Sequence, residues 1–350
     1  MRHHAACLLI LAAICLSAHG PLARLPDDRV LGGWSDENRD SYAFLWNAWW
    51  LGQPSQPGWP LHTELMFAPM GLDLRHHSLS LLPSALAAML AWPLGLVRGF
   101  NLSLLLMGWL AGVSAYWLSW RLIGSRTASL ATGLVFLLAP ARLIQATAHP
   151  NIAAAGFLPL GILALVQAAR RPDARRLPLA ALALVAAALC SWYHLLPLIA
   201  FSLLGAIGCL VWRRRQGLGS AIGLLGPWLP AALVLMPLAW PLWRRPALSS
   251  GGDAARFSAR LWDLLWPHSL HPLRQLGWLA APPPTPGNQI EASLYLGWVT
   301  LTLAGNRLIL GVEKIVWIFV RKEVLGYRTD IELENACAAF CPNFYEPRTG

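Results

Sequence analysis

Charged residues are scarce in this sequence, and lysine is almost absent. Only 13% of the 350 residues are charged, against 56% that are hydrophobic, and the two lysines are Lys314 and Lys322. Between residues 74 and 252 the one carboxylate is Asp173. Because soluble domains carry about 25% charged residues, this composition excludes an ordinary soluble fold and indicates a polytopic membrane protein.

Several motifs that carry known chemistry are also missing. The chain has no GxGxxG fingerprint, no Walker A pattern and no HExxH sequence, so it lacks the usual marks of dinucleotide-binding proteins, P-loop proteins and zincins. His268 and His271 have i, i+3 spacing, but Pro267 and Pro272 disfavour a regular helix around them. No metal site and no disulfide framework are predicted.

Long apolar runs are what the sequence has in abundance. Runs near the roughly 20 residues that cross about 30 Å of hydrocarbon recur along the chain. We therefore expect an all-α fold, a polytopic transmembrane helical bundle of about eight spans. The expected spans are residues 5–19, 101–120, 127–145, 151–169, 177–192, 194–212, 220–242 and 294–312.

Arginine clusters at the ends of these runs predict the topology. The net charge is +10, but such clusters indicate topology and lipid-headgroup contact rather than nucleic acid. If residues 78–97 do not cross, the clusters at 121–126, 170–176 and 213–215 are all cytoplasmic, as the positive-inside rule requires. We therefore expect residues 78–97, interrupted by Pro83 and Pro93, to form a helix at the exported interface, with a true span as the alternative.

This topology divides the chain into segments. Residues 1–20 form a first span or signal anchor, with a cleaved signal peptide as the alternative, and residues 21–100 form an exported loop with interfacial helices. Residues 101–305 form the multi-span membrane domain, which includes a second exported loop at 243–293 and a turn at 191–197 between two spans. Residues 306–350 form a cytoplasmic tail of atypical composition, because both lysines and six of the seventeen carboxylates lie there.

The stretch "SDENRDSYAFLWNAWW", residues 35–50, concentrates carboxylates beside aromatic residues. Seven of the eleven carboxylates before residue 306 lie in this first loop, so any acid–base chemistry that uses a carboxylate is directed to it. Asp40 begins an expected helix whose apolar stripe includes Phe44 and Trp50, and this helix would lie in the lipid headgroup layer. Asp40 is then either a helix-capping acid or a functional carboxylate beside an aromatic wall.

The order of short patterns along residues 1–305 resembles a known enzyme group. After the first apolar run come "YAFLWNAWW", "RHHSLSLLPSALAAMLAWPLGLVRGFNLSLLL", "APARLIQATAHPNIAAAGFLPL" and the "SWYH" turn. This layout resembles bacterial multi-pass glycosyltransferases of the GT-C superfamily, relatives of the mannosyl- and arabinosyltransferases that use polyprenyl-phosphate sugars. The resemblance implies an enzyme of the bacterial inner membrane that moves a sugar from such a donor to a glycan, lipid or protein acceptor on the extracytoplasmic face, with inversion.

The resemblance also implies residue roles. An acidic residue in the first exported loop is the usual catalytic base, which points to Asp40, with Asp36 and Glu37 as rivals. The place of a second acidic residue reads "ATAHPN" here, with His149 and no carboxylate, which leaves a requirement for a divalent metal open.

Charge that grows on the leaving phosphate needs donors. The substrate-binding candidates are Arg39, Arg75, His76, Arg142, His149, Tyr193, His194, Arg244 and Arg245. Each of them has an ordinary alternative as a membrane-edge arginine or a polar turn residue. Competing functions are a transporter or lipid flippase and a truncated, non-catalytic remnant. Ionisable residues are scarce within the expected spans, which argues against an ion-coupled carrier.

Overall fold

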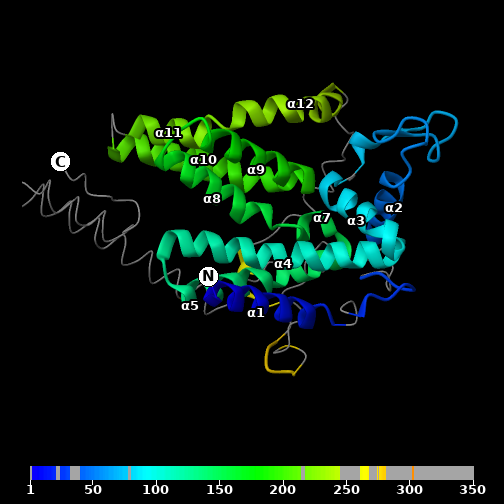
Figure 1. Cartoon of the computed structure of the whole chain (residues 1–350), viewed down its shortest axis with the longest axis horizontal. Helices are drawn as coiled ribbons and strands as arrows, with labels where there is room; N and C mark the ends of the chain where they lie inside the picture. Colours follow the sequence, from blue (N-terminus) through cyan, green and yellow to red (C-terminus); the bar gives the residue numbers. More distant parts are fainter. Residues whose placement is uncertain are drawn as a thin grey trace, which may run out of the picture. The chain divides into compact units, whose positions relative to one another are not determined.

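The structure is a computed structural model of the chain. It describes residues 2–20, 24–31, 40–77, 80–213, 217–244, 261–267, 274, 276–280 and 302. By contacts, the chain forms two compact units, residues 1–255 and 256–350. The described part of the first unit is mostly helical (Figure 1).

Twelve α-helices follow one another in the described part of this unit. They are α1 (Arg2–Ala18), α2 (Asp40–Leu51), α3 (Leu81–Leu94), α4 (Leu96–Ile123), α5 (Arg126–Leu137), α6 (Pro140–Ala148), α7 (Pro150–Ala153), α8 (Phe157–Arg170), α9 (Arg176–Cys190), α10 (Leu195–Arg213), α11 (Gly217–Leu225) and α12 (Trp228–Arg244). Two short 3-10 helices, η3 (Leu74–His76) and η4 (Trp192–His194), lie between them. Strands β1 (His62–Thr63) and β2 (Leu72–Asp73) pair antiparallel, with His62 opposite Asp73.

Glycine, serine and proline set the helix boundaries around the α4–α5 turn. Gly124 has a φ of 75° and ends α4, a left-handed conformation that glycine adopts without strain. The Ser125 side chain then accepts a hydrogen bond from the Ala128 backbone N–H at 3.3 Å and caps α5. Pro140 opens α6, where its missing N–H costs nothing.

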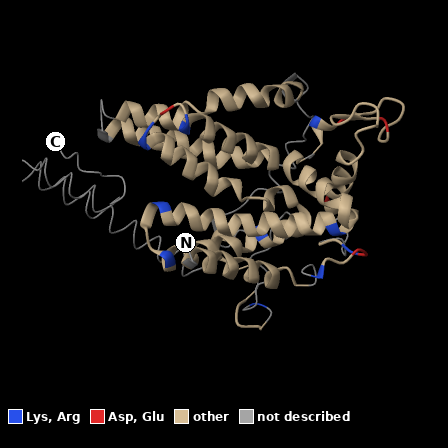
Figure 2. Cartoon of the chain, viewed as in Figure 1, with Lys and Arg blue, Asp and Glu red and all other residues tan. Residues whose placement is uncertain are grey.

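Four helical stretches are long and apolar enough to cross a membrane, which makes the structure compatible with an integral membrane protein. They are residues 96–123, 126–148, 192–211 and 217–241, and shorter apolar helices cover 3–18, 81–94, 157–170 and 176–190. Large apolar side chains such as Leu204, Leu229 and Leu233 are exposed along these helices, which favours a lipid surrounding over water. Figure 2 shows most of the described Arg, Asp and Glu residues at helix ends and in the loops.

The structure can be compared with the helix and turn positions that the sequence predicts. The turn predicted within residues 191–197 is confirmed, because α9 ends at Cys190 and η4 leads into α10. A helix was expected within 78–97, and α3 runs there from Leu81 to Leu94 without a break at Pro83 or Pro93. Pro83 lies in the first turn, where backbone N–H groups have no helical partner, and Pro93 lies at the opposite end.

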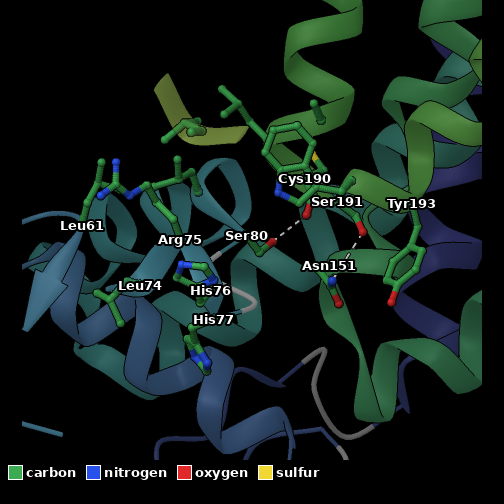
Figure 3. A pocket seen from close by; sticks show the side chains of 15 residues that line it. Leu61, Leu74, Arg75, His76, His77, Ser80, Asn151, Cys190, Ser191 and Tyr193 are labelled. Carbon is green, nitrogen blue, oxygen red and sulfur yellow. Dashed lines mark hydrogen bonds between the residues drawn. The ribbon is translucent and has the colours of Figure 1, made fainter. Parts of the chain in front are cut away.

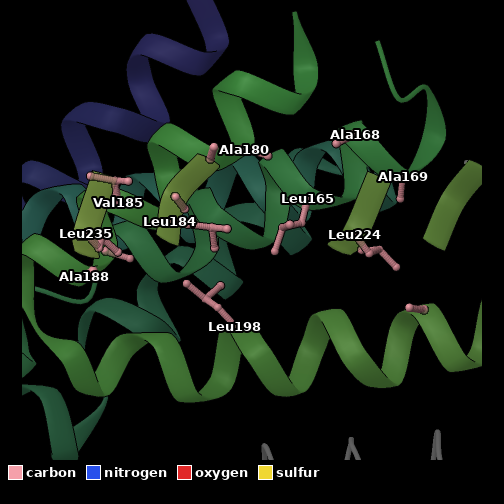
Figure 4. Packing of buried hydrophobic residues seen from close by; sticks show 14 of the residues in the cluster. Leu165, Ala168, Ala169, Ala180, Leu184, Val185, Ala188, Leu198, Leu224 and Leu235 are labelled. Atoms are coloured by element: carbon pink, nitrogen blue, oxygen red, sulfur yellow. The ribbon is translucent and has the colours of Figure 1, made fainter. Parts of the chain in front are cut away.

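The largest hydrophobic core joins α8, α9, α10, α11 and α12 (Figure 4). Leu165, Leu184 and Leu198 are completely buried there, among several alanines. The small residues allow close helix approach: a Cβ at Gly223 would lie 2.2 Å from the Ala168 carbonyl oxygen. Association through small residues is typical of membrane helices.

A second set of helices packs through separate cores. Leu11 of α1 packs with Tyr116 of α4 and Leu137 of α5. Phe44 of α2 packs with Phe100 of α4 and residues of α3. The aromatic stripe expected to face lipid headgroups is therefore buried largely in protein, and Trp50 is only 1% exposed.

Little of the second unit is described. Helix α14 (Leu261–Leu265) carries Trp262, whose ring stacks on Trp266 with centroids 5.3 Å apart. Apart from residue 302, the expected span at 294–312 lies outside the described residues. The tail at 306–350 and the pair His268 and His271 lie outside them as well.

Candidate functional site

A cavity of about 420 Å³ lies where η3, the start of α3, α7, the α9–η4 corner and α12 meet (Figure 3). Three residues that the sequence singled out, Arg75, His76 and Tyr193, line it. Tyr193 is far along the chain from the neighbours Arg75 and His76, and packing brings the two segments together. A cavity of this size falls within the range of ligand pockets.

Arg75 is held by Asp73 at the cavity wall. The Arg75 Nε donates to Asp73 Oδ1 at 2.8 Å and Nη2 donates to Oδ2 at 2.7 Å. These bonds from Arg75 hold the pKa of the Asp73 carboxyl below its usual range, against the opposing effect of partial burial. The guanidinium is therefore already neutralised, which argues against its expected role as the donor that stabilises a phosphate.

Polar side chains on the opposite wall are neutral. Ser80 Oγ donates to the Cys190 carbonyl oxygen at 2.8 Å, and Asn151 Nδ2 lies 3.4 Å from Ser191 Oγ (Figure 3). Asn151 is only 8% exposed, and its Oδ1 has no hydrogen-bond partner among the described residues. A buried acceptor without a donor is costly, so this oxygen is a position where a ligand hydroxyl or amide would be stabilised.

Asp40 and His149, both singled out from the sequence, contact each other through their side chains. His149 Nε2 lies 3.1 Å from Asp40 Oδ2, and His149 Nδ1 lies 2.8 Å from Gln145 Oε1. Ser41 Oγ donates to the Thr147 carbonyl oxygen at 3.2 Å and so fixes the start of α2 against the end of α6. The Asp40 side chain is 65% exposed, which leaves it accessible to a reacting molecule.

His77 connects this pair to the cavity wall. It lines the cavity, and its Nε2 lies 3.1 Å from Oδ1 of the fully buried Asn47. Burial lowers the pKa of His77, and the negative charge of Asp40 opposes that shift. The field of Asp40 therefore reaches a residue of the cavity. His149 and Asn151 strengthen the connection. His149 lies beside Asp40 and is the N-cap residue of α7, and α7 carries Asn151 in the cavity wall.

A second polar cluster is buried between α1, α4 and α6. Arg142 Nε donates to the Leu137 carbonyl oxygen at 2.7 Å, but its Nη2 has no hydrogen-bond partner among the described residues. His19 Nδ1 donates to the Cys15 carbonyl oxygen at 2.8 Å, and its Nε2 is likewise without a partner there. Arg142 is 7% exposed and His19 is 6% exposed.

The backbone of Gly108 makes room for this cluster. A Cβ at Gly108 would lie 3.2 Å from Arg142 Nη1 and 3.3 Å from His19 Cε1. No ion pair joins Arg142 to a carboxylate among the described residues. Arg142 lies on α6, and His149 is the C-cap residue of the same helix.

The remaining predicted residues lie elsewhere. His194 is 3% exposed, its Nε2 faces the Ile152 carbonyl oxygen at 3.1 Å, and it does not line the cavity. Asp36, Glu37, Arg39 and Arg245 lie outside the described residues, as does the side chain of Arg244 at the end of α12. Within the described ranges no three His, Cys, Asp or Glu side chains are grouped to hold a metal.

Sequence reasoning did not identify Asn151 or Asp73. Asn151 follows His149 inside an otherwise apolar run, and an isolated amide in such a run is a usable sign of a polar site. Asp73 stands two residues before Arg75, a spacing that allows the carboxylate to bond both the backbone and the guanidinium. Its role as the counter-charge of Arg75 depends on the local turn geometry.

The fold and the site define a mostly helical protein that is compatible with an integral membrane location. The chain belongs to the family described as Domain of unknown function (DUF6311), which matches residues 54–331. No curated protein and no solved structure matches the chain. The matched range contains the cavity-lining residues, Arg142 and His149, whereas Asp40 and His19 precede it.

Proposed function

We propose that this protein is a membrane glycosyltransferase of the GT-C type. It would move a sugar from a polyprenyl-phosphate donor to an acceptor at the extracytoplasmic face of a bacterial inner membrane, in a bundle of about eight spans whose first loop is exported. The observation that carries the proposal is the Asp40–His149 pair, an accessible carboxylate held at 3.1 Å from an imidazole beside a polar cavity.

The proposed reaction is a single displacement with Asp40 as general base. The oxygen of an acceptor hydroxyl forms a bond to the anomeric carbon of the donor, while the bond from that carbon to the phosphate oxygen breaks. The hydroxyl proton moves to the Asp40 carboxylate, and the electron pair of the broken bond stays on the phosphate. His149 is a positioning residue: it contacts Oδ2 of Asp40 and is itself held by Gln145.

Negative charge that grows on the leaving phosphate needs a positive charge nearby. Arg75 supplies little, since its guanidinium is bonded to Asp73. Arg142 keeps an uncompensated charge among the described residues, inside a bundle where the low dielectric constant makes charges act over longer distances. We therefore assign phosphate stabilisation to Arg142.

The cavity suits an uncharged sugar. The arginine of its wall, Arg75, is paired with Asp73, and burial lowers the pKa of His77, which favours the neutral imidazole. Ser80, Ser191, Asn151 and Tyr193 contribute neutral hydroxyl and amide groups to the wall. These groups match the hydroxyl-rich surface of a neutral sugar better than a charged group.

The test is sugar transfer in membranes with a panel of radiolabelled polyprenyl-phosphate sugars. Asp40→Asn, at matched expression, should lower transfer about 100-fold or more, the scale of a missing general base. Asp28→Asn is the matched control, because Asp28 belongs to the same N-terminal stretch and its exposed carboxylate pairs with Arg29. Full activity of Asp40→Asn would remove the catalytic assignment, and absence of transfer from every donor in the wild type would overturn the proposed function.

A further inference from the structure

The loop that joins β1 to β2 exposes an apolar tip. Residues 65–70 read "LMFAPM", and Leu65, Phe67 and Met70 are 58%, 70% and 82% exposed. The tip contains no charged residue. Large apolar side chains gathered on one short loop mark a contact surface, because water is a poor surrounding for them.

The conformation of the tip is built into the loop. The Thr63 side chain is completely buried, and its Oγ1 accepts a hydrogen bond from the Leu65 backbone N–H at 3.2 Å. The Phe67 carbonyl oxygen accepts hydrogen bonds from the N–H groups of Met70 and Gly71 at 3.1 and 3.2 Å. The apolar side chains are therefore presented outward by a hydrogen-bonded turn that continues into the β1–β2 pair.

The loop is attached at the end of a helix that can cross a membrane. Strand β2 leads directly into η3, and η3 packs against α12. Arg75 Nη1 donates to the Pro237 carbonyl oxygen at 3.4 Å, and Pro237 lies near the end of the apolar stretch 217–241. Figure 1 shows the light blue loop before α3 standing clear of the helices near the end of α12.

The apolar surface of α12 continues toward this loop. Leu233, Met236 and Trp240 are all exposed on α12, and Trp240 lies near its end, where tryptophan is favoured at the boundary between hydrocarbon and headgroups. The tip of residues 65–70 is joined through β2 to η3, which packs against this helix. Lipid is the surrounding that suits the exposed apolar side chains of both α12 and the tip.

We infer that residues 65–70 insert into the interfacial layer of the bilayer and anchor η3, and with it the cavity wall, at the membrane surface. An uncharged tip with Leu, Phe and two Met side chains suits the boundary between headgroups and acyl chains. This inference does not depend on the proposed glycosyltransferase activity, because it rests on exposure and position alone.

The test is photo-crosslinking in proteoliposomes made from the full chain. A benzophenone amino acid replaces Phe67 in one variant, Met70 in a second and Leu233 of α12 in a third, which is the lipid-facing reference. A fourth carries it at Ser55, an exposed polar position in the segment between α2 and β1. After illumination, mass spectrometry of the intact protein and its peptides measures lipid adducts and protein adducts.

Lipid adducts at positions 67 and 70 at a yield within about threefold of position 233, with at least tenfold less at position 55, are expected from the interfacial placement. Adducts between two copies of the chain at 67 and 70 would overturn the inference in favour of a protein contact. Water-quenched label at both positions, while position 233 gives lipid adducts, would overturn it as well. Phe67→Ser and Met70→Ser together should leave the unfolding midpoint in detergent unchanged, because both side chains are exposed.

Discussion

Arg75 and Arg142 lie in two regions of the protein that differ in how far the arginine is buried and in whether a carboxylate lies beside it. At the cavity wall, Arg75 has a side chain that is 30% exposed and a carboxylate at 2.7 Å. Between α1, α4 and α6, Arg142 is 7% exposed and has no carboxylate partner among the described residues. Burial should favour pairing, since an isolated buried charge is costly.

The contrast separates an arginine that has a carboxylate partner from one that has none among the described residues. Pairing with Asp73 fixes the turn from β2 into η3 and neutralises the arginine of the cavity wall. The proposed function gives Arg142 a negatively charged partner, the leaving phosphate of the donor. Replacing the charged residues of each region by uncharged ones tests this difference.

The largest effect is expected from Arg142→Met. Transfer activity should fall about 100-fold or more, the scale of a lost electrostatic stabiliser of the transition state. The unfolding midpoint in detergent should stay unchanged or rise, because Met replaces a buried charge by an apolar side chain of similar length.

Arg75→Met is the matched control for Arg142→Met. It should keep activity within a few-fold of wild type, and its unfolding midpoint should fall, because Asp73 loses its partner. Equal losses of activity in the two variants would remove the distinction between the two regions. A lowered midpoint in Arg142→Met would make that arginine structural.

A smaller effect is expected from Asp73→Asn, which leaves Arg75 without its counter-charge. The free energy of unfolding should fall by about 1 kcal/mol, the usual size for a partly exposed pair with good geometry. Thermal unfolding of the purified protein in detergent measures it. If Asp73→Asn, Arg75→Met and the double variant gave strictly additive changes, the pair would contribute no coupling.

The smallest effect is a pH dependence from His77. Burial lowers the pKa of His77 from its ordinary 6.5, so the unfolded chain binds this proton more readily than the folded one. Stability should therefore fall as the pH drops below about 6.5, toward the lowered pKa of the folded state. His77→Gln should reduce the dependence, measured as the difference in unfolding midpoint between the variant and wild type at pH 7.5 and pH 5.5. An equal change in unfolding midpoint between pH 7.5 and pH 5.5 for the two proteins would contradict this expectation.

Local sequence features predicted much of the fold. Apolar runs gave the helical class, and the corner between α9 and α10 followed because the run from 177 to 212 is too long for one crossing. Asp40 was expected at a helix start and begins α2. Pro83 and Pro93 do not break α3, because a proline disrupts a helix in its interior and is tolerated near the ends.

Of the site residues that the sequence predicts, some meet at a site in the structure and others do not. Arg75, His76 and Tyr193 line one cavity, and Asp40 meets His149, all from positions named in advance. His194, by contrast, bonds to the backbone of Ile152. Sequence placed all of them at helix ends or turns, but the orientation of each side chain depends on which neighbours pack beside it.

The sequence by itself determined the apolar helices, their turns and the restriction of carboxylates to a few places, because run length, glycine, proline and charge act over a few residues. Only the tertiary structure decided that Asp40 faces His149, that Asp73 neutralises Arg75 and that Arg142 has no carboxylate partner among the described residues. Those pairings join segments from different helices, so they depend on how the helices pack and on which polar atoms packing leaves within reach of a partner.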